Sequence, residues 1–233
     1  MSEQPKVGNL ALRLLTAAVL VPLLLYSLLS GPRWLFPSMT AIVCVLGAIE
    51  LFTMAAPAHL ALRIWGVFAT MVAFAPVSGV VSDAFLVPSV IVVVCGGLLA
   101  SLVHVDPIED AGLRMGWAVA GPFYLGALFG VIARLFNQPH GGEWVVLVMF
   151  YAFGSDTMGY FVGRAFGRHK LYEAVSPKKT VEGSLGGLLG ALFGGFLAHF
   201  WFLPTLPLGH AIVLSVAAAG AGQAGDLCES LLK

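Results

Sequence analysis

The sequence has very little charge for its length. Among 233 residues, Asp, Glu, Lys and Arg make up 10% and hydrophobic residues 59%, whereas soluble domains carry about 25% charged residues. The mean hydropathy is correspondingly high, at +0.93. A water-soluble core cannot absorb that much apolar surface, so the composition excludes an ordinary soluble globular domain.

The sequence also lacks an excess of positive or negative charge, and its cysteines form no recognisable pattern. The formal net charge is zero, which gives no basic surplus for a nucleic-acid partner, so none is expected. The three cysteines, Cys44, Cys95 and Cys228, lie in apolar stretches without CxxC or metal-ligand spacing. We therefore expect packing roles for them and no disulfide or cysteine metal site.

Long apolar runs are what the chain has instead. They recur along its whole length at close to the roughly 20 residues that cross a hydrocarbon core. The pattern predicts an all-α fold, a polytopic membrane helical bundle with about eight transmembrane helices. The first run follows Lys6 and Arg13, and we expect it to remain as a start-transfer helix. The predicted spans are 12–29, 34–56, 60–81, 84–103, 115–136, 144–162, 185–203 and 208–225.

The distribution of Lys and Arg predicts the orientation. With a cytoplasmic N-terminus, only Arg33 and Arg134 lie outside. Basic residues concentrate in cytoplasmic connections of membrane proteins, so this count favours that topology. The ten basic residues inside would be Lys6, Arg13, Arg63, Arg114, Arg164, Arg168, Lys170, Lys178, Lys179 and Lys233.

The connection 163–184 is the one long polar stretch between spans and holds five of the twelve basic residues. Positive-inside bias, with contact to anionic headgroups, would explain its charge. That bias does not explain why Ser176, Thr180, Glu182 and Gly183 surround the two adjacent lysines. The segment is thus predicted to be a cytoplasmic basic loop with a binding role.

Asp156 lies well inside the sixth apolar run, where a carboxylate costs roughly 2.5 to 3.5 kcal/mol on insertion scales. Gly159, Tyr160 and Gly163 share its helical face, which should therefore point into the protein. Two interpretations stay open for Asp156. It either belongs to a polar site or caps a broken helix beside one basic group.

The end of the last apolar run also has a polar face. Gln223, Asp226, Glu229 or Ser230, and Lys233 recur at helical spacing. The alternative interpretation is a solvated turn beyond the end of the span. Stripes of small residues predict close packing of the last three spans. These stripes are Gly159, Gly163 and Gly167; Gly186, Gly190 and Gly194; and Ala218 and Gly222.

Two carboxylates beside a loop rich in Lys, Ser and Thr are typical of a phosphate-handling site. Asp156 and Asp226 would hold Mg²⁺ with water and substrate phosphates. Lys178 and Lys179 would neutralise phosphate charge. A cation or metabolite transporter also uses intramembrane carboxylates, so it remains the alternative from another class, although no internal repeat accompanies them.

Three segments resemble ordered motifs of the phosphatidate cytidylyltransferases, also called CDP-diglyceride synthases. They read SDTMGYFVGRAFGRHKL, SPKKTVEGSLGG and GDLCESLLK, between about Phe150 and Lys233. The resemblance implies a membrane nucleotidyltransferase that uses CTP and phosphatidate, requires Mg²⁺ and releases CDP-diacylglycerol and pyrophosphate. A short N-terminus without a transit peptide favours a bacterial plasma membrane, and the distribution of Lys and Arg predicts an active site that faces the cytoplasm. A homodimer is left open.

The resemblance assigns roles by motif. Asp226 would be a metal ligand and a catalytic residue, with Asp156, Lys179 and Lys233 also in the catalytic set. The substrate-binding region would comprise Ser176, Lys178, Lys179, Thr180, Glu182 and Gly183.

The domain division follows from the same motifs. Residues 1–143 are expected to form five N-terminal spans, and residues 144–233 the catalytic part with spans six to eight. The family pattern continues beyond the position of Lys233 with a further metal-binding carboxylate and a last span. We therefore expect the chain to be truncated, with an inactive remnant as the alternative.

Overall fold

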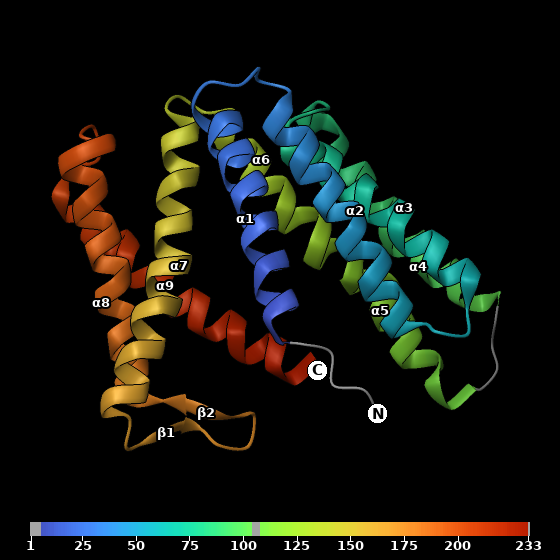
Figure 1. The fold of residues 1–233 in the computed structure, drawn as a ribbon. Helices are drawn as coiled ribbons and strands as arrows, with labels where there is room; N and C mark the ends of the chain where they lie inside the picture. Colours follow the sequence, from blue (N-terminus) through green and yellow to red (C-terminus); the bar gives the residue numbers. More distant parts are fainter. Residues whose placement is uncertain (1–5, 104–107, 233) are drawn as a thin grey trace. The chain divides into compact units, whose positions relative to one another are not determined.

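The computed structural model describes residues 6–103 and 108–232. The chain is overwhelmingly helical, which confirms the predicted all-α class (Figure 1). Two short strands, β1 (Lys170–Tyr172) and β2 (Ser176–Thr180), form an antiparallel hairpin. The α-helices are α1 (Lys6–Leu29), α2 (Leu35–Ala55), α3 (Leu60–Ser78), α4 (Leu86–Leu102), α5 (Ala111–Pro122), α6 (Leu128–Phe136), α7 (Gly141–Phe166), α8 (Val181–Leu197) and α9 (Leu208–Leu232).

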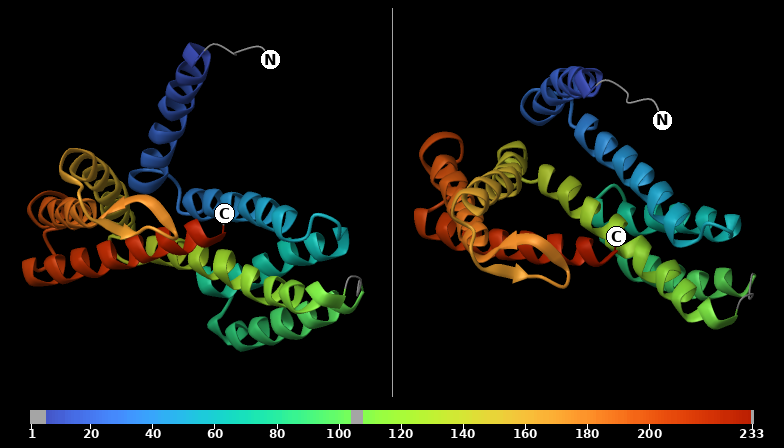
Figure 2. Two further views of the ribbon diagram at one scale, coloured as in Figure 1. Left: turned by 90° about the horizontal axis from the view of Figure 1, so that it is seen from below. Right: turned by 60° about the horizontal axis from the view of Figure 1, so that its bottom comes forward.

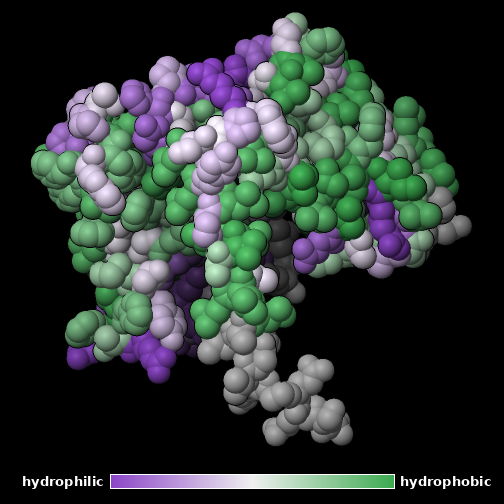
Figure 3. All heavy atoms as spheres, turned by 45° about the horizontal axis from the view of Figure 1, so that its top comes forward, coloured by the Kyte–Doolittle hydropathy of each residue, from purple (hydrophilic) through white to green (hydrophobic). Residues whose placement is uncertain are grey.

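The helices have the length and composition of membrane spans. Within the described residues, seven helical stretches can cross a bilayer, and a shorter apolar helix, Leu14–Leu29, lies within α1. Figure 3 shows hydrophobic residues over much of the visible face, as expected for side chains that face lipid. The chain is an integral membrane protein, and the predicted polytopic bundle is confirmed. The seven are Leu35–Ala55, Leu60–Ser78, Asp83–Leu102, Ile108–Phe136, Gly141–Phe166, Val181–Phe202 and Leu208–Leu231.

The chain divides into two compact units, Met1–Gly141 and Gly142–Lys233. In the first unit, α3 packs against α2, α4, α5 and α6. A π-helical turn, η3 (Phe123–Ala127), joins α5 to α6 into one continuous helix. At one end of this unit, Arg134 forms two hydrogen bonds of 2.9 Å with the carboxylate of Asp83. The assignment of catalysis to residues 144–233 stays a prediction.

In the second unit, α7 and α8 approach each other backbone to backbone. A Cβ at Gly183 would lie 2.9 Å from the main-chain oxygen of Gly159, and one at Gly190 would meet the oxygen of Gly154. Substitution at either position therefore requires the helices to move apart. On α9, Ala218 packs against a buried apolar cluster, whereas a Cβ at Gly222 would meet nothing within 4 Å. Close packing through small residues thus joins α7 to α8, whereas the predicted stripe on α9 faces open space at Gly222.

A buried apolar cluster forms the core farther along the same three helices. The buried cluster draws on α7, α8, α9 and the connection between α8 and α9. Tyr151 of α7 donates to the main-chain oxygen of Ala211 at 3.5 Å, and Ser215 donates to the same oxygen at 2.7 Å. The cluster contains Leu147, Tyr151, Ala191, Ala198, Leu203, Leu206, Ala211 and Ala219.

The polar connection expected as a loop is largely structured. Helix α7 continues to Phe166, the β-hairpin follows, and α8 already begins at Val181. The hairpin lies at the ends of α7 and α8 in every ribbon view (Figures 1 and 2). Pairing of Lys170 with Thr180 and of Tyr172 with Ser176 sets its register, with an irregularity between the two pairs. The polar residues around the two lysines are therefore held on a strand and on the first turn of a helix.

Candidate functional site

A pocket of about 360 Å³ lies entirely within the second unit. Its walls come from α7, the hairpin, the first two turns of α8 and the last part of α9. Of the nine residues assigned to the catalytic and substrate-binding sets from the sequence, it brings together six. These are Asp156, Lys178, Lys179, Thr180, Gly183 and Asp226.

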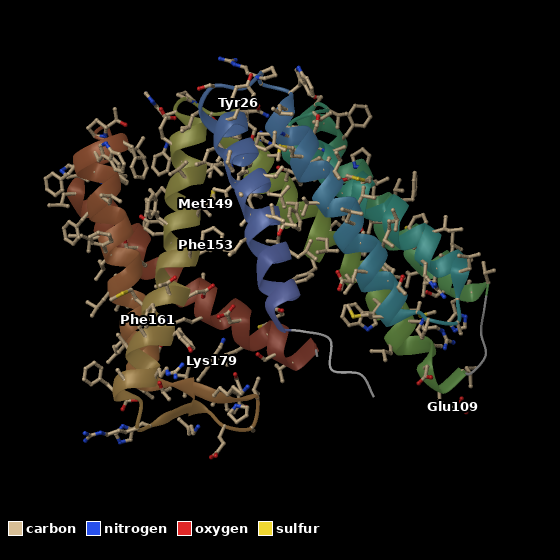
Figure 4. The ribbon with its side chains drawn as sticks, viewed as in Figure 1. Tyr26, Glu109, Met149, Phe153, Phe161 and Lys179 are labelled. Carbon is tan, nitrogen blue, oxygen red and sulfur yellow. The ribbon has the colours of Figure 1, made fainter. Side chains whose placement is uncertain are left out.

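An ion pair connects two sides of the pocket. Nζ of Lys179, on β2, lies 3.1 Å from Oδ2 of Asp226, on α9. Figure 4 shows the labelled Lys179 extending from the hairpin toward the helices. The Nζ atom is buried and has no hydrogen bond of good geometry among the described residues, so the pairing with Asp226 is mainly electrostatic. Both side chains keep partial exposure, at 30% for Lys179 and 47% for Asp226.

Asp156 faces the same pocket from α7. It interacts electrostatically with both Asp226 and Lys179. Gly159 lies one turn after Asp156 on α7, and a Cβ there would lie 3.2 Å from the main-chain oxygen of Gly183. The close contact of α7 with α8 thus fixes the position of the Asp156 backbone. One lysine and two carboxylates from three elements share this space.

The N-terminus of α8 forms another wall. Thr180 is the N-cap, and its Oγ1 accepts a hydrogen bond of 3.1 Å from the main-chain N–H of Gly183. A threonine in extended conformation at this position satisfies one of the otherwise unpaired N–H groups of the first turn. The end of a helix that carries free N–H groups has a partial positive charge and favours anions such as phosphate. Lys178 and Lys179 precede this turn directly.

Three predicted site residues are not among those that line the pocket. Glu182 instead accepts hydrogen bonds from the main-chain N–H groups of Arg168 and His169, at 3.0 and 3.2 Å. Its other oxygen lies 2.7 Å from Nδ1 of His169. This carboxylate therefore holds the start of the hairpin. Ser176 lies at the far end of β2, paired with Tyr172, and Lys233 lies outside the described residues.

The pocket also contains side chains that sequence reasoning did not assign to it. Ser184 of α8 donates to Oε1 of Gln223 on α9, and Nε2 of Gln223 donates to the main-chain oxygen of Ser184 at 2.9 Å. Gly187 leaves room for this contact, since a Cβ there would lie 3.3 Å from Nε2 of Gln223. Gln223 falls on the polar face noted for α9, which was the available signal. Nothing in the sequence indicated Ser184 as its partner.

The pocket wall on α7 adds an aromatic and a guanidinium group. Arg164 donates from NH1 to the Tyr160 hydroxyl at 2.7 Å, and its Cζ lies 6.0 Å from the centre of the Tyr160 ring. Both residues lie one and two turns beyond Asp156 on the same helical face. The sequence already placed Tyr160 on this face, and the same spacing could have added Arg164 to the site.

Comparison with known proteins connects this geometry to a family. The family model described as "Cytidylyltransferase family" matches residues 11–233. The chain belongs to this cytidylyltransferase family. The resemblance seen in the three C-terminal motifs is therefore confirmed at the level of the family, and the match includes the N-terminal spans.

Curated proteins similar to this chain carry the name phosphatidate cytidylyltransferase. The protein of Haemophilus influenzae is 37% identical over 117 residues, which are 48% of this chain and 41% of the relative. That of Bacillus subtilis is 29% identical over 121 residues, 52% of this chain and 45% of the relative. That of Brucella abortus is 34% identical over 126 residues, which are 51% of this chain and 44% of the relative. The matched stretch spans less than half the length of these relatives.

The two carboxylates of the pocket have the chemistry needed to hold a magnesium ion. No group of three or more His, Cys, Asp or Glu side chains in the described part of the chain could enclose a metal. Asp156 and Asp226 nevertheless present carboxylate oxygens to one pocket beside cationic groups. Mg²⁺ is commonly held by one or two carboxylates together with water and substrate phosphates. The donor set matches this mode of binding and differs from a protein-enclosed metal site.

Proposed function

We propose that this chain transfers a cytidylyl group from CTP to phosphatidate, giving CDP-diacylglycerol and pyrophosphate in phospholipid biosynthesis. The observation that carries the proposal is the pocket in which Lys178, Lys179 and the N-terminus of α8 face Asp156 and Asp226. Family membership and the names of the curated relatives support the same reaction.

In the proposed reaction, an oxygen of the phosphatidate phosphate attacks the α-phosphorus of CTP. A new P–O bond forms, the bond from the α-phosphorus to the bridging oxygen breaks, and pyrophosphate leaves with that oxygen. Lys178 and Lys179 would bind the phosphate oxygens and stabilise their developing charge, and the partial positive charge at the N-terminus of α8 would add to this effect. The pocket would orient the two substrates, which requires no covalent nucleophile.

Asp226, with Asp156 beside it, would hold Mg²⁺ against the nucleotide phosphates. When bound, the ion would neutralise phosphate charge and orient the reacting group. The carboxylates would then have two partners, because Asp226 also pairs with Lys179 at 3.1 Å. Lys179 would balance the carboxylate charge before substrate binds and contact phosphate afterwards.

The proposed setting is a bacterial plasma membrane, with the pocket facing the cytoplasm. This orientation is supported by the basic residues around the hairpin, since Lys and Arg are enriched on the cytoplasmic side. Phosphatidate would then enter from the bilayer and CTP from the cytoplasm. A homodimer is part of this proposal, and cross-linking in membranes would test it.

The decisive test is turnover with labelled CTP, phosphatidate and Mg²⁺ by the purified protein. We expect labelled CDP-diacylglycerol, and a loss of at least 100-fold with Asp226→Asn. Glu173→Gln is the matched control, because Glu173 lies between the two strands, is exposed and does not line the pocket. Absence of product, or equal activity of Asp226→Asn and wild type, would reject the proposal. Solute flux in proteoliposomes without nucleotide turnover would favour the transporter alternative.

A further inference from the structure

Arg164 is a cationic group of the pocket for which the described residues supply no acidic partner. Lys179 is paired with Asp226, whereas no carboxylate of the described residues contacts Arg164. Its contact is to a neutral oxygen, the Tyr160 hydroxyl, at 2.7 Å. The Cζ atom of the guanidinium also lies over the Tyr160 ring, 6.0 Å from the ring centre. It is therefore held in place while its full positive charge stays available to an anion.

The position of Arg164 along α7 corresponds to the lipid headgroups. Helix α7 has 26 residues, so at 1.5 Å per residue it is about 39 Å long. The hydrocarbon core is about 30 Å thick, so the ends of the helix reach beyond it. Arg164 stands two residues before the last residue of α7. Asp156, eight residues earlier, lies about 12 Å deeper along the helix axis.

Tyr160 stands between the pocket and the lipid-facing surface. It lines the pocket, yet 58% of it is exposed, and its ring meets the ring of Phe161 edge-on at 5.6 Å. Phe161 is itself 61% exposed and belongs to a membrane span. A tyrosine between apolar and polar surroundings is typical of the membrane interface. This wall of the pocket therefore adjoins lipid.

We infer that Arg164, oriented by Tyr160, is the subsite that binds the phosphate headgroup of the anionic lipid substrate as it enters from the bilayer. This inference rests on the proposed function and adds a division of labour to it. Lys178, Lys179 and the N-terminus of α8 serve the nucleotide phosphates. Arg164 serves the lipid phosphomonoester, whose two or three free oxygens suit a planar guanidinium.

The test is a separate measurement of KM for each substrate in mixed micelles. We expect Arg164→Gln to raise KM for phosphatidate at least tenfold and to change KM for CTP less than twofold. Arg164→Lys should give a KM for phosphatidate between those of wild type and Arg164→Gln, because it keeps the positive charge and loses the planar guanidinium. Tyr160→Phe should raise KM for phosphatidate about threefold by releasing the guanidinium. Arg168→Gln is the matched control, since Arg168 is exposed on the hairpin side and does not line the pocket.

A binding measurement separates this inference from the proposed reaction. Retention of labelled phosphatidate by the purified protein in nanodiscs of neutral lipid should fall with Arg164→Gln and stay at the wild-type level with Arg168→Gln. Loss of turnover in wild type with Arg164-dependent retention intact would reject the reaction and keep the lipid subsite. A rise in KM for CTP alone, or equal retention by both variants, overturns the subsite.

Discussion

Lys179 on β2 and Asp226 on α9 lie 3.1 Å apart, measured from Nζ to Oδ2, and so connect the hairpin to the last helix across the pocket. This pair balances a carboxylate near a second one, Asp156. Partly exposed ion pairs contribute little to folding stability. The value of the pair therefore lies in its chemistry, because it positions a cation and a carboxylate where substrate phosphate would arrive.

The first prediction concerns this lysine. We expect Lys179→Gln to lower kcat/KM for CTP at least 100-fold, which corresponds to about 2.7 kcal/mol of transition-state stabilisation. The reason is loss of positive charge next to the transferring phosphate. Steady-state kinetics with CTP as the varied substrate measures it. Lys170→Gln, outside the pocket, should change the same parameter less than threefold, and a comparable loss there would point to a general effect of hairpin charge.

The second prediction concerns the contact between α8 and α9. Gln223 is one turn before Asp226 and makes two hydrogen bonds with Ser184. Gln223→Leu should reduce kcat about tenfold and raise the Mg²⁺ concentration needed for half-maximal rate, because Asp226 loses its fixed orientation. Ser184→Ala should have a smaller effect, since the Gln223 bond to the main-chain oxygen of Ser184 persists.

The control for this prediction is Gly222→Ala, a substitution at the residue next to Gln223. A Cβ there would meet nothing within 4 Å, so we expect wild-type kinetics and Mg²⁺ dependence. If Gln223→Leu altered thermal stability alone and left the Mg²⁺ dependence unchanged, Gln223 would be a packing residue with no influence on Asp226.

The third prediction concerns the backbone contact of α7 with α8. A Cβ at Gly190 would collide with the main-chain oxygen of Gly154. Such overpacking costs about 1 to 3 kcal/mol, so Gly190→Ala should lower the thermal unfolding midpoint in detergent. Gly220→Ala on α9 places the same methyl group in open space and should leave the midpoint within experimental error. Equal midpoints for the two variants would contradict the close contact.

The fourth prediction concerns Glu182, whose carboxylate accepts hydrogen bonds from the main-chain N–H groups of Arg168 and His169. Glu182→Ala removes these charge-assisted bonds and should release the start of the hairpin. We expect trypsin to cleave after Arg168 or Lys170 at least tenfold faster than in wild type, as followed by mass spectrometry. His169→Gln keeps both main-chain bonds, so its cleavage rate should stay within about threefold of wild type.

Much of the fold could be predicted from hydropathy, because a bilayer requires helices of defined length. The predicted runs at 34–56, 60–81 and 208–225 correspond to α2, α3 and most of α9. The hairpin was not predicted. Its second strand, Ser176–Thr180, is short and polar and contains Pro177, so it lacks the apolar alternation that indicates a strand. Pairing with β1 and the cap at the start of α8 stabilise it locally.

The site was partly predictable for a similar reason. The cost of a carboxylate in a membrane indicated that Asp156 faces the interior, and the polar helical face at the end of the last run indicated Asp226. Both residues do line one pocket. The pairing of Gln223 with Ser184 depends on the rotation and axial register of two helices. Helical periodicity gives the face of a single helix but not its register against another. For the same reason, the hydrogen-bond partners of Glu182 could not be predicted from the sequence.

Thr180 is both the last residue of β2 and the N-cap of α8, so strand and helix join with no residue between them. A flexible linker would allow Lys178 and Lys179 to move independently of the helix, but here none exists. The hydrogen bond that the Gly183 N–H donates to Thr180 Oγ1 fixes this junction to the first turn of α8. Movement of the hairpin is therefore coupled to movement of α8 through Thr180.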